Sequence, residues 1–543
     1  MPNSKEISRP SVAALPRGDG DSTPSETHSK DRHVGSNVEL TFARRGEVVE
    51  SVGDVDGFDS TRMRDRALLN ADEEKALLRR IDIRIMTICS IIFLIKNLDS
   101  ENISNARIMN KGTPRNIMTQ LKMSSDEYNL LTVLYYVPYI VLEAPSNLFL
   151  KRFKPSTWQS RIMISWGIAL LCHVPVVNKQ GLYATRFLLG AFEAGMFPGV
   201  ILQMTYWYRP DEMSLRLLLF YVLGNLSGVV SGILAFAFDT VSGARGLSGW
   251  QWLFLAQGLL TVVAGVAIKF LLPDFPPTAK WLTDKEKAFI QARLPPNAPR
   301  ASEANFNFRE IVESLKDIRL WLFTGIWATF TVGTSGVRFY QPTVIASLGF
   351  ASIARSQLLN LPISILAIIV IGVTGWLADK AIVPRPLFPL GVFAVILACY
   401  GVLIVFPSNT AVYIAILIGN AFTSAFFPLM WPWRVQTTSK ATGSAFAIGF
   451  VNSYGQIGGA IGPQIFQGKY APRYRESFAA AAALVGSCCI VTLTTWWVTR
   501  QTEADTRRLK RARIQASRNN LAVLDDVVDR DLGKKNVNSL ESV

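Results

Sequence analysis

Long apolar stretches separated by short polar connections make up most of the chain. Twelve of them reach the roughly twenty residues that a helix needs to cross a bilayer. They lie at approximately 83–104, 128–149, 158–177, 182–206, 216–238, 250–272, 319–340, 357–377, 387–406, 411–432, 444–466 and 478–499. The pattern therefore predicts an all-α membrane protein with twelve transmembrane helices.

One long polar stretch divides the twelve predicted spans into two groups of six. It covers residues 273–318, and the flanking halves, 81–272 and 319–499, are nearly equal in length, as expected of a duplicated six-helix unit. Within this stretch, Thr283 and Glu286 form a Thr-x-x-Glu pattern. This pattern predicts a capped helix that ends near Pro295 in a central cytosolic loop.

The two ends of the chain are polar. Residues 1–80 are rich in Ser, Gly, Pro, Asp and Arg, which predicts a disordered N-terminal tail, with one short amphipathic helix from about Asn70 to Arg80 at the membrane surface. Residues 500–543 are predicted to form a basic C-terminal tail. An even number of spans places both ends on one side, and the basic residues beside the spans predict that this side is the cytosol.

Composition and charge exclude several classes of protein. Hydrophobic residues make up 49% of the chain and charged residues only 18%, which argues against a soluble multi-domain enzyme. The net charge of +15 raises nucleic-acid binding, but the basic residues cluster beside apolar segments, so no nucleic-acid partner is predicted. The three histidines and five cysteines form no catalytic, metal-binding or CxxC pattern, and no GxxxxGK[ST] loop is present. We therefore predict no enzymatic activity, no metal and no cofactor.

Charged residues inside predicted spans are the first candidates for a functional site, because an ionised side chain at bilayer depth is costly unless it faces the protein interior. Asp99, Arg186, Glu193 and Arg338 are the strongest candidates. Arg186 and Glu193 are seven positions apart, which places them on one face of the fourth span. One of them could contact substrate while the other takes up a proton. The alternative is that Asp99 and Arg186 form a fixed pair that only locks two helices.

Polar and aromatic residues in other spans extend this candidate site. Arg338 and Tyr340 follow an apolar run in the seventh span, where they could face a central cavity, although Arg338 could instead extend to the outer interface. Asn452 and Gln456 share a helix face and could hydrogen-bond a polar substrate. Glu143, near the cytosolic end of the second span, is predicted to pair with loop cations and to act in gating.

Glycine and tryptophan residues in the spans have simpler interpretations. Glycines at four-residue or shorter steps are typical of close helix packing, and we leave them out of the site; these are Gly224, Gly228 and Gly232, and Gly455, Gly458, Gly459 and Gly462. Tryptophans at span ends are predicted to anchor the protein at the membrane interface; these are Trp431, Trp433, Trp496 and Trp497.

A short motif after the eighth span resembles the loop signature of the major facilitator superfamily. It reads Gly375-Trp-Leu-Ala-Asp379-Lys380. Glycine permits close helix approach, and the aspartate can cap and pair at a cytosolic helix end. The resemblance implies that Gly375, Asp379 and Lys380 take part in gating between two six-helix halves.

Further motifs resemble the allantoate permease family of fungi, in the anion:cation symporter branch of that superfamily. They lie in four of the predicted spans: residues 98–107 (LDSENISNAR), 143–147 (EAPSN), 186–199 (RFLLGAFEAGMFPG), and 452–456 with 462–466 (NSYGQ and GPQIF). The match covers nearly the whole membrane region and leaves out both tails.

This resemblance implies a monomeric secondary transporter in the plasma membrane that works by alternating access. Its partners would be a small organic anion, such as a ureide or a vitamin carboxylate, and protons taken up with it. Glu193 would be the main proton-coupling carboxylate, with Asp99 sharing that role and holding Arg186 in position.

One departure from the family pattern concerns the substrate's charge. Ser100 stands where the family usually has arginine, and Lys96, one turn earlier on the same helix face, could supply the missing positive charge. A carboxylate would then be held by Arg338 or Arg186, with Lys96 assisting. Two alternatives stay open: proton-linked efflux of a secondary metabolite, and a membrane sensor that transports nothing.

Overall fold

The computed structural model describes residues 42–46, 64–209, 211–294, 308–348, 358–436, 441–466, 470 and 473–523. Its described residues fall into two compact units. The larger unit comprises Arg80–Lys280 and Pro296–Glu503, and the smaller combines Met1–Arg79, Trp281–Pro295 and Ala504–Val543. Most of the N-terminal tail predicted to be disordered, and the last twenty residues, lie outside the described part of the chain.

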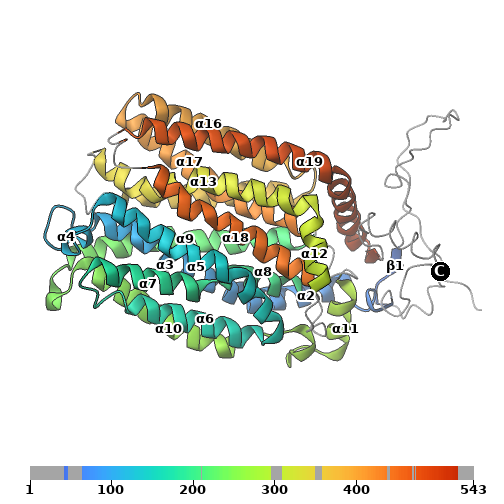
Figure 1. Ribbon diagram of the computed structural model, residues 1–543. Helices are drawn as coiled ribbons and strands as arrows, with labels where there is room; N and C mark the ends of the chain where they lie inside the picture. Colours follow the sequence, from blue (N-terminus) through green and yellow to red (C-terminus); the bar gives the residue numbers. More distant parts are fainter. Residues whose placement is uncertain are drawn as a thin grey trace, which may run out of the picture. The chain divides into compact units, whose positions relative to one another are not determined.

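Helices make up the larger unit, and they correspond to the twelve predicted spans (Figure 1). The first six spans are η1 with α3 (Asp82–Met86 and Thr87–Ile108), α5 (Ser125–Arg152), α6 (Pro155–Leu171), α7 with α8 (Lys179–Glu193 and Met196–Thr205), α9 (Met213–Thr240) and α10 (Gly249–Leu271). The last six are α13 (Ile318–Ser347), η4 with α15 (Leu358–Asn360 and Leu361–Asp379), α16 (Leu387–Val405), α17 (Asn409–Gln436), α18 (Ala441–Ile465) and α19 (Arg475–Arg518). Short helices α4 (Ile117–Gln120), η2 (Ala244–Gly246), η3 (Pro276–Thr278) and α12 (Phe308–Lys316) connect them.

The two halves meet along a few helix pairs. Within the first half, α3 packs on α9, α5 on α7, and α6 on α10; within the second, α13 packs on α18, and α17 on α15 and α16. Between the halves, α5 lies beside α18 and α9 lies beside α15, with α3 against α13. A cavity between the halves is therefore bordered mainly by these helices.

The helices of the larger unit differ in hydropathy. Seven helices of the described chain are long and apolar enough to cross a membrane by that criterion alone. Of the remaining five, α6 is only 17 residues long, and α3, α5, α13 and α18 carry more polar or charged side chains. These four helices pack across the interface between the halves, α5 on α18 and α3 on α13, so their polar side chains have protein surfaces to face.

The fourth span is broken where the sequence predicted one continuous helix. α7 ends at Glu193, and α8 begins at Met196 after Gly195, whose φ of 88° is in the left-handed region. A side chain at this glycine would be strained and would collide with Ser146 of α5. Since α7 ends at Glu193, the break leaves that carboxylate at a helix terminus inside the bundle.

The smaller unit joins three segments that are distant in sequence. β1 (Phe42–Arg44) and β2 (Leu521–Val523) form an antiparallel pair, accompanied by α2 (Ala71–Ile81) and α11 (Asp284–Arg293). Arg45 and Arg293 both form ion pairs with Glu74. The predicted helix in the central loop is confirmed, since Thr283 and Glu286 form a capping box at the start of α11.

The tails differ from the prediction where they are described. Part of the predicted disordered segment, residues 1–80, is a strand paired with the C-terminal segment, and α19 continues well beyond residue 499, to Arg518. Sequence polarity did not reveal this order, because the pairing depends on residues almost five hundred positions away. The interface role of two tryptophans is also wrong: Trp431 and Trp433 are fully buried in the bundle, whereas Trp497 is exposed.

Candidate functional site

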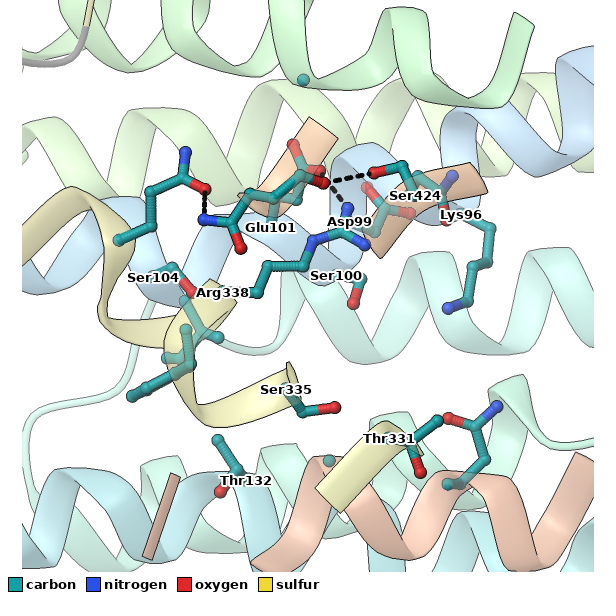
Figure 2. Close-up of a pocket in the computed structure, with 18 of the residues that line it drawn as sticks. Lys96, Asp99, Ser100, Glu101, Ser104, Thr132, Thr331, Ser335, Arg338 and Ser424 are labelled. Carbon is teal, nitrogen blue, oxygen red and sulfur yellow. Dashed lines mark hydrogen bonds and ion pairs between the residues drawn. The ribbon is translucent and has the colours of Figure 1, made fainter. Parts of the chain in front are cut away.

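A cavity of about 310 Å³ lies between the two halves (Figure 2). Its walls come from both halves: α3, α5, α7, α8 and α9 on one side, and α13, α15, α17 and α18 on the other. No residue of α6, α10, α16 or α19 lines it among the described residues. Its size is at the lower end of the range for small-molecule sites.

Six predicted site residues line this cavity: Lys96, Asp99, Arg186, Arg338, Asn452 and Gln456. Lys96 and Ser100 both do so, which confirms that they share one face of α3 (Figure 2). Glycines that the sequence analysis assigned to packing also line the cavity, namely Gly228, Gly232, Gly455 and Gly459. At Gly455 and Gly459 a side chain would collide with Trp327 and Tyr136, so these positions serve close packing as well.

Lys96 and Glu193 form an ion pair inside the first half. The Lys96 Nζ lies 3.6 Å from the Glu193 Oε1, and the Glu193 side chain is almost completely buried. The sequence placed Glu193 on one helix face with Arg186 and predicted no partner for it on another helix. The structure places the Lys96 ammonium against this carboxylate instead, so Lys96 is not a free cation for substrate in this conformation.

Asp99 accepts hydrogen bonds from two neutral donors on α6 and α10, helices that do not line the cavity. Trp166 Nε1 of α6 and Thr261 Oγ1 of α10 each donate to Asp99 Oδ2 at 2.9 Å. The predicted ion pair between Asp99 and Arg186 is wrong, since no such pair forms among the described residues. A carboxylate that accepts two hydrogen bonds is already positioned without a cation.

Arg186 is a buried cation without a carboxylate partner in the part of the chain that the structure describes. Its side chain is 3% exposed, and its Nε and Nη2 have no hydrogen-bond partner there. The guanidinium stacks over the Phe254 ring, 5.3 Å from the centroid. Since Arg186 lines the cavity, a buried guanidinium with unused donors stands at the cavity wall.

Arg338 is paired across the two halves. Its Nη2 lies 3.1 Å from Oε1 of Glu101 on α3, and both residues line the cavity (Figure 2). The Arg338 side chain therefore lies in the cavity, paired with Glu101. In this conformation it does not extend to the outer interface, which was the alternative prediction. Glu101 was missed by the sequence analysis, although its position inside the first span was a visible signal.

Glu143 forms a contact that differs from its predicted one. It is completely buried and accepts a hydrogen bond from Asn452 Nδ2, which joins α5 of the first half to α18 of the second. The prediction that Glu143 pairs with loop cations is therefore wrong. A gating role remains compatible with this contact, because a bond between halves must break when they separate.

Tyr340 does not line the cavity. It is buried beside it, where its hydroxyl donates to Asn129 Oδ1 at 3.1 Å and its ring lies under the Arg107 guanidinium, 4.6 Å away. Arg107 also donates to Asn129 at 3.0 Å, and Gln464 of α18 donates to the Asn129 carbonyl at 2.9 Å. This network ties α3 and α5 to α13 and α18. Arg107 and Asn129 were missed by the sequence analysis, because polar residues near span ends usually face solvent.

The comparisons with known proteins agree with this architecture. A family model described as Major Facilitator Superfamily matches residues 109–463. The chain belongs to the Major Facilitator Superfamily. It is therefore a multi-pass membrane transporter with twelve transmembrane helices in two six-helix halves.

Individual relatives support the same assignment. The MFS transporter prlL of a fungal species is 31% identical over 312 residues, which cover 58% of this chain and 63% of that protein. A protein of Agrobacterium vitis whose name describes a tartrate transporter is 29% identical over 400 residues, covering 73% of this chain and 89% of that one. The crystal structure of an inward-facing bacterial homolog of the human lysosomal transporter Spinster covers 78% of this chain and 97% of its own, with a TM-score of 0.56 and 15% identity.

The loop signature of the superfamily lies at the end of α15. Gly375 approaches α9 so closely that a side chain there would collide with Leu218, and Lys380 lies over the Trp376 ring, 3.4 Å from its centroid. The negative charge of Asp379 interacts electrostatically with Arg385 in the following loop. The sequence did not indicate Arg385 as a functional residue. Burial lowers the pKa of the Arg385 guanidinium, and the charges of Asp379 and Glu503 partly offset this effect.

Arg385 also joins the two halves of the transporter. It donates through Nη1 to Ser214 Oγ at the start of α9, while its backbone N–H donates to Glu503 at 3.1 Å. Together with the bond between Glu143 and Asn452, which lies at the cavity wall, this contact joins the two halves.

Proposed function

We propose that this transporter takes up a small organic anion together with protons, by alternating access of its two halves around the cavity. The observation that carries the proposal is Arg186, a buried cavity cation whose Nε and Nη2 have no partner among the described residues. Lys96 and Arg338 each already pair with a carboxylate. A guanidinium offers parallel donors that match a carboxylate, so we expect the substrate's anionic group to bind at Arg186.

The charge balance around the cavity favours binding of the anion with a proton. Lys96, Arg186 and Arg338 line the cavity together with Asp99 and Glu101, and Glu193 pairs with Lys96 although it does not line the cavity itself. Protonation of one carboxylate leaves one positive charge without a counter-ion, which attracts an anion. We assign this proton to Glu193, since it is buried next to Lys96, and give Asp99 the secondary role.

The substrate class and the location complete the proposal. The name of the relative from Agrobacterium vitis describes transport of tartrate, a dicarboxylate, which supports an organic anion as substrate. The motifs quoted above support membership of the allantoate permease branch of the superfamily. The basic residues that flank the spans support cytosolic termini, and the resemblance to the allantoate permease family supports a monomer in the plasma membrane.

Two other functions, metabolite efflux and sensing without transport, would require different residues around the cavity. Efflux of a neutral or cationic metabolite would leave Arg186 without a ligand. A sensor that transports nothing would not need charged residues on both sides of a cavity between two halves, and such residues are costly in a membrane. The arrangement of charges therefore favours an anion transporter over both.

The proposal is tested by uptake of labelled compounds in yeast that lacks its own carboxylate transporters. The panel should include monocarboxylates, dicarboxylates, ureides and neutral analogues of the same size, each at several external pH values. We expect uptake of at least one anion above the empty-vector control, with faster uptake at lower external pH, and no uptake of its neutral amide. Export of a neutral compound, with no anion taken up, would support the efflux alternative and reject the proposal.

A further inference from the structure

Three buried polar side chains behind the cavity have no hydrogen-bond partner among the described residues. They are Asn102 on α3, Ser227 on α9 and Gln257 on α10, and their exposed fractions are 0%, 1% and 2%. Both polar atoms of each amide and the Ser227 hydroxyl oxygen have no partner there, and neither has Asp99 Oδ1. Apart from Asp99, none of these residues lines the cavity.

Two hydrogen bonds fix the level of these residues along their helices. Thr261 on α10 donates to Asp99 on α3 at 2.9 Å. Asn102 is one turn beyond Asp99, and Gln257 is one turn before Thr261. The first and sixth spans run in opposite directions. One turn forward from Asp99 and one turn back from Thr261 therefore lead in the same direction along the bundle axis. Asn102 and Gln257 therefore lie at one level of the bundle.

The second hydrogen bond places Ser227 at the same level. Asn105 on α3 donates to Ser231 on α9 at 2.8 Å. The first and fifth spans run in the same direction, and Asn102 and Ser227 each precede a member of this bond by one turn. The three unpartnered side chains thus lie at one level of three helices that pack on one another, α3, α9 and α10, one turn from Asp99.

A group of buried polar atoms without partners is costly, so such groups in folded proteins usually surround an ion or ordered water. Four oxygens without partners among the described residues lie within one turn of this level: one carboxylate oxygen, two amide oxygens and one hydroxyl. Oxygen ligands select hard cations, and a single carboxylate provides too little charge for most divalent ions. We propose that Asp99, Asn102, Ser227 and Gln257 bind a sodium ion inside the first half of the transporter.

This site shares Asp99 with the substrate cavity. A sodium ion bound to Asp99 neutralises this carboxylate, which makes the charge of the cavity wall more positive and favours an anionic group there. This effect on substrate rests on the proposed anion transport. Sodium binding itself does not depend on substrate, and it is separate from proton uptake at Glu193.

Sodium binding can be measured on the full-length protein purified in detergent, without substrate. The Tm and the tryptophan fluorescence are recorded at constant pH and ionic strength while NaCl replaces choline chloride. We expect a saturable rise in Tm, because an ion that binds only the folded state stabilises it. The fluorescence should change over the same concentration range, because Trp166 donates to Asp99. Identical Tm values in sodium and choline over the whole range would overturn the proposal.

Variants separate this site from a general effect of salt. Asn102→Ala and Gln257→Ala should each raise the sodium concentration for half-maximal stabilisation by about tenfold or more, and the milder Ser227→Ala by a smaller factor. Ser231→Ala is the matched control, since it removes a satisfied hydrogen bond one turn away and should leave the sodium response unchanged. If Asn102→Ala and Gln257→Ala do not fold, the sodium response of Ser227→Ala decides the result. A wild-type sodium response in that variant would overturn the proposal.

The same measurements distinguish failure of this inference from failure of the proposed function. Proton-driven anion uptake without any sodium-dependent Tm would reject the sodium site alone. Sodium-dependent stabilisation with no anion transport would support the sodium site and reject the proposed substrate class.

Discussion

Replacing Arg186 with lysine is expected to raise the apparent KM for an anionic substrate by about ten- to a hundredfold. This corresponds to roughly 1.5 to 3 kcal/mol, the range for a hydrogen bond to a charged group. The guanidinium has two buried donors without partners among the described residues, whereas lysine offers one point charge on a different stem. Initial rates of labelled uptake over a range of substrate concentrations measure the effect.

The matched comparison is Arg338→Lys. Arg338 is already paired with Glu101, and lysine can keep that ion pair, so we expect a much smaller change in KM. Surface abundance of each variant must be measured, because Arg186 is buried. If Arg186→Lys has wild-type KM at wild-type abundance, the substrate's anionic group does not bind at Arg186.

Replacing Glu193 with glutamine is expected to abolish accumulation of substrate against its gradient while exchange of substrate across the membrane continues. Glutamine keeps the shape of the side chain but cannot take up and release a proton. The ion pair with Lys96 is lost as well, and breaking a buried pair is costly, so protein abundance has to be recorded. Uptake with and without a pH gradient, and exchange between labelled and unlabelled substrate, separate the two activities.

Glu127→Gln is the control for this change. It makes the same substitution at the start of α5, where Glu127 pairs with Lys179 outside the cavity. We expect this variant to accumulate substrate normally. A Glu193→Gln transporter that still concentrates substrate with normal pH dependence would move proton coupling to another carboxylate, of which Asp99 is the first candidate.

Much of the fold was predictable from the sequence, because it depends on local patterns. Apolar stretches of about twenty residues gave the spans, and the capping box at Thr283 gave the start of α11. The break at Gly195 was not predicted, since a glycine in an apolar run is equally compatible with close helix packing. The pairing of β1 with β2 was also beyond sequence patterns, as it joins the two ends of the chain.

For the candidate site, too, the sequence predicted local features but not contacts between different helices. Intramembrane charges identified Lys96, Asp99, Arg186 and Arg338 as cavity residues, because their burial in lipid would be too costly. Their partners were predicted wrongly or missed. Helix spacing relates residues on one helix, as for Arg186 and Glu193, but the pair between Lys96 and Glu193 depends on how α3 and α7 are placed in the bundle.

Proton-coupled anion uptake is tested most directly by accumulation of a labelled carboxylate in proteoliposomes that contain the purified full-length protein. The substrate is the anion that the uptake panel identifies, and the vesicle interior is made alkaline relative to the outside. If uptake is coupled to protons, the vesicles should accumulate the substrate transiently above equilibrium, and a protonophore should abolish this accumulation. Addition of substrate without a pH gradient should cause proton influx. Equilibration to the same level with and without the gradient, with no proton movement on addition of substrate, would contradict proton-coupled uptake.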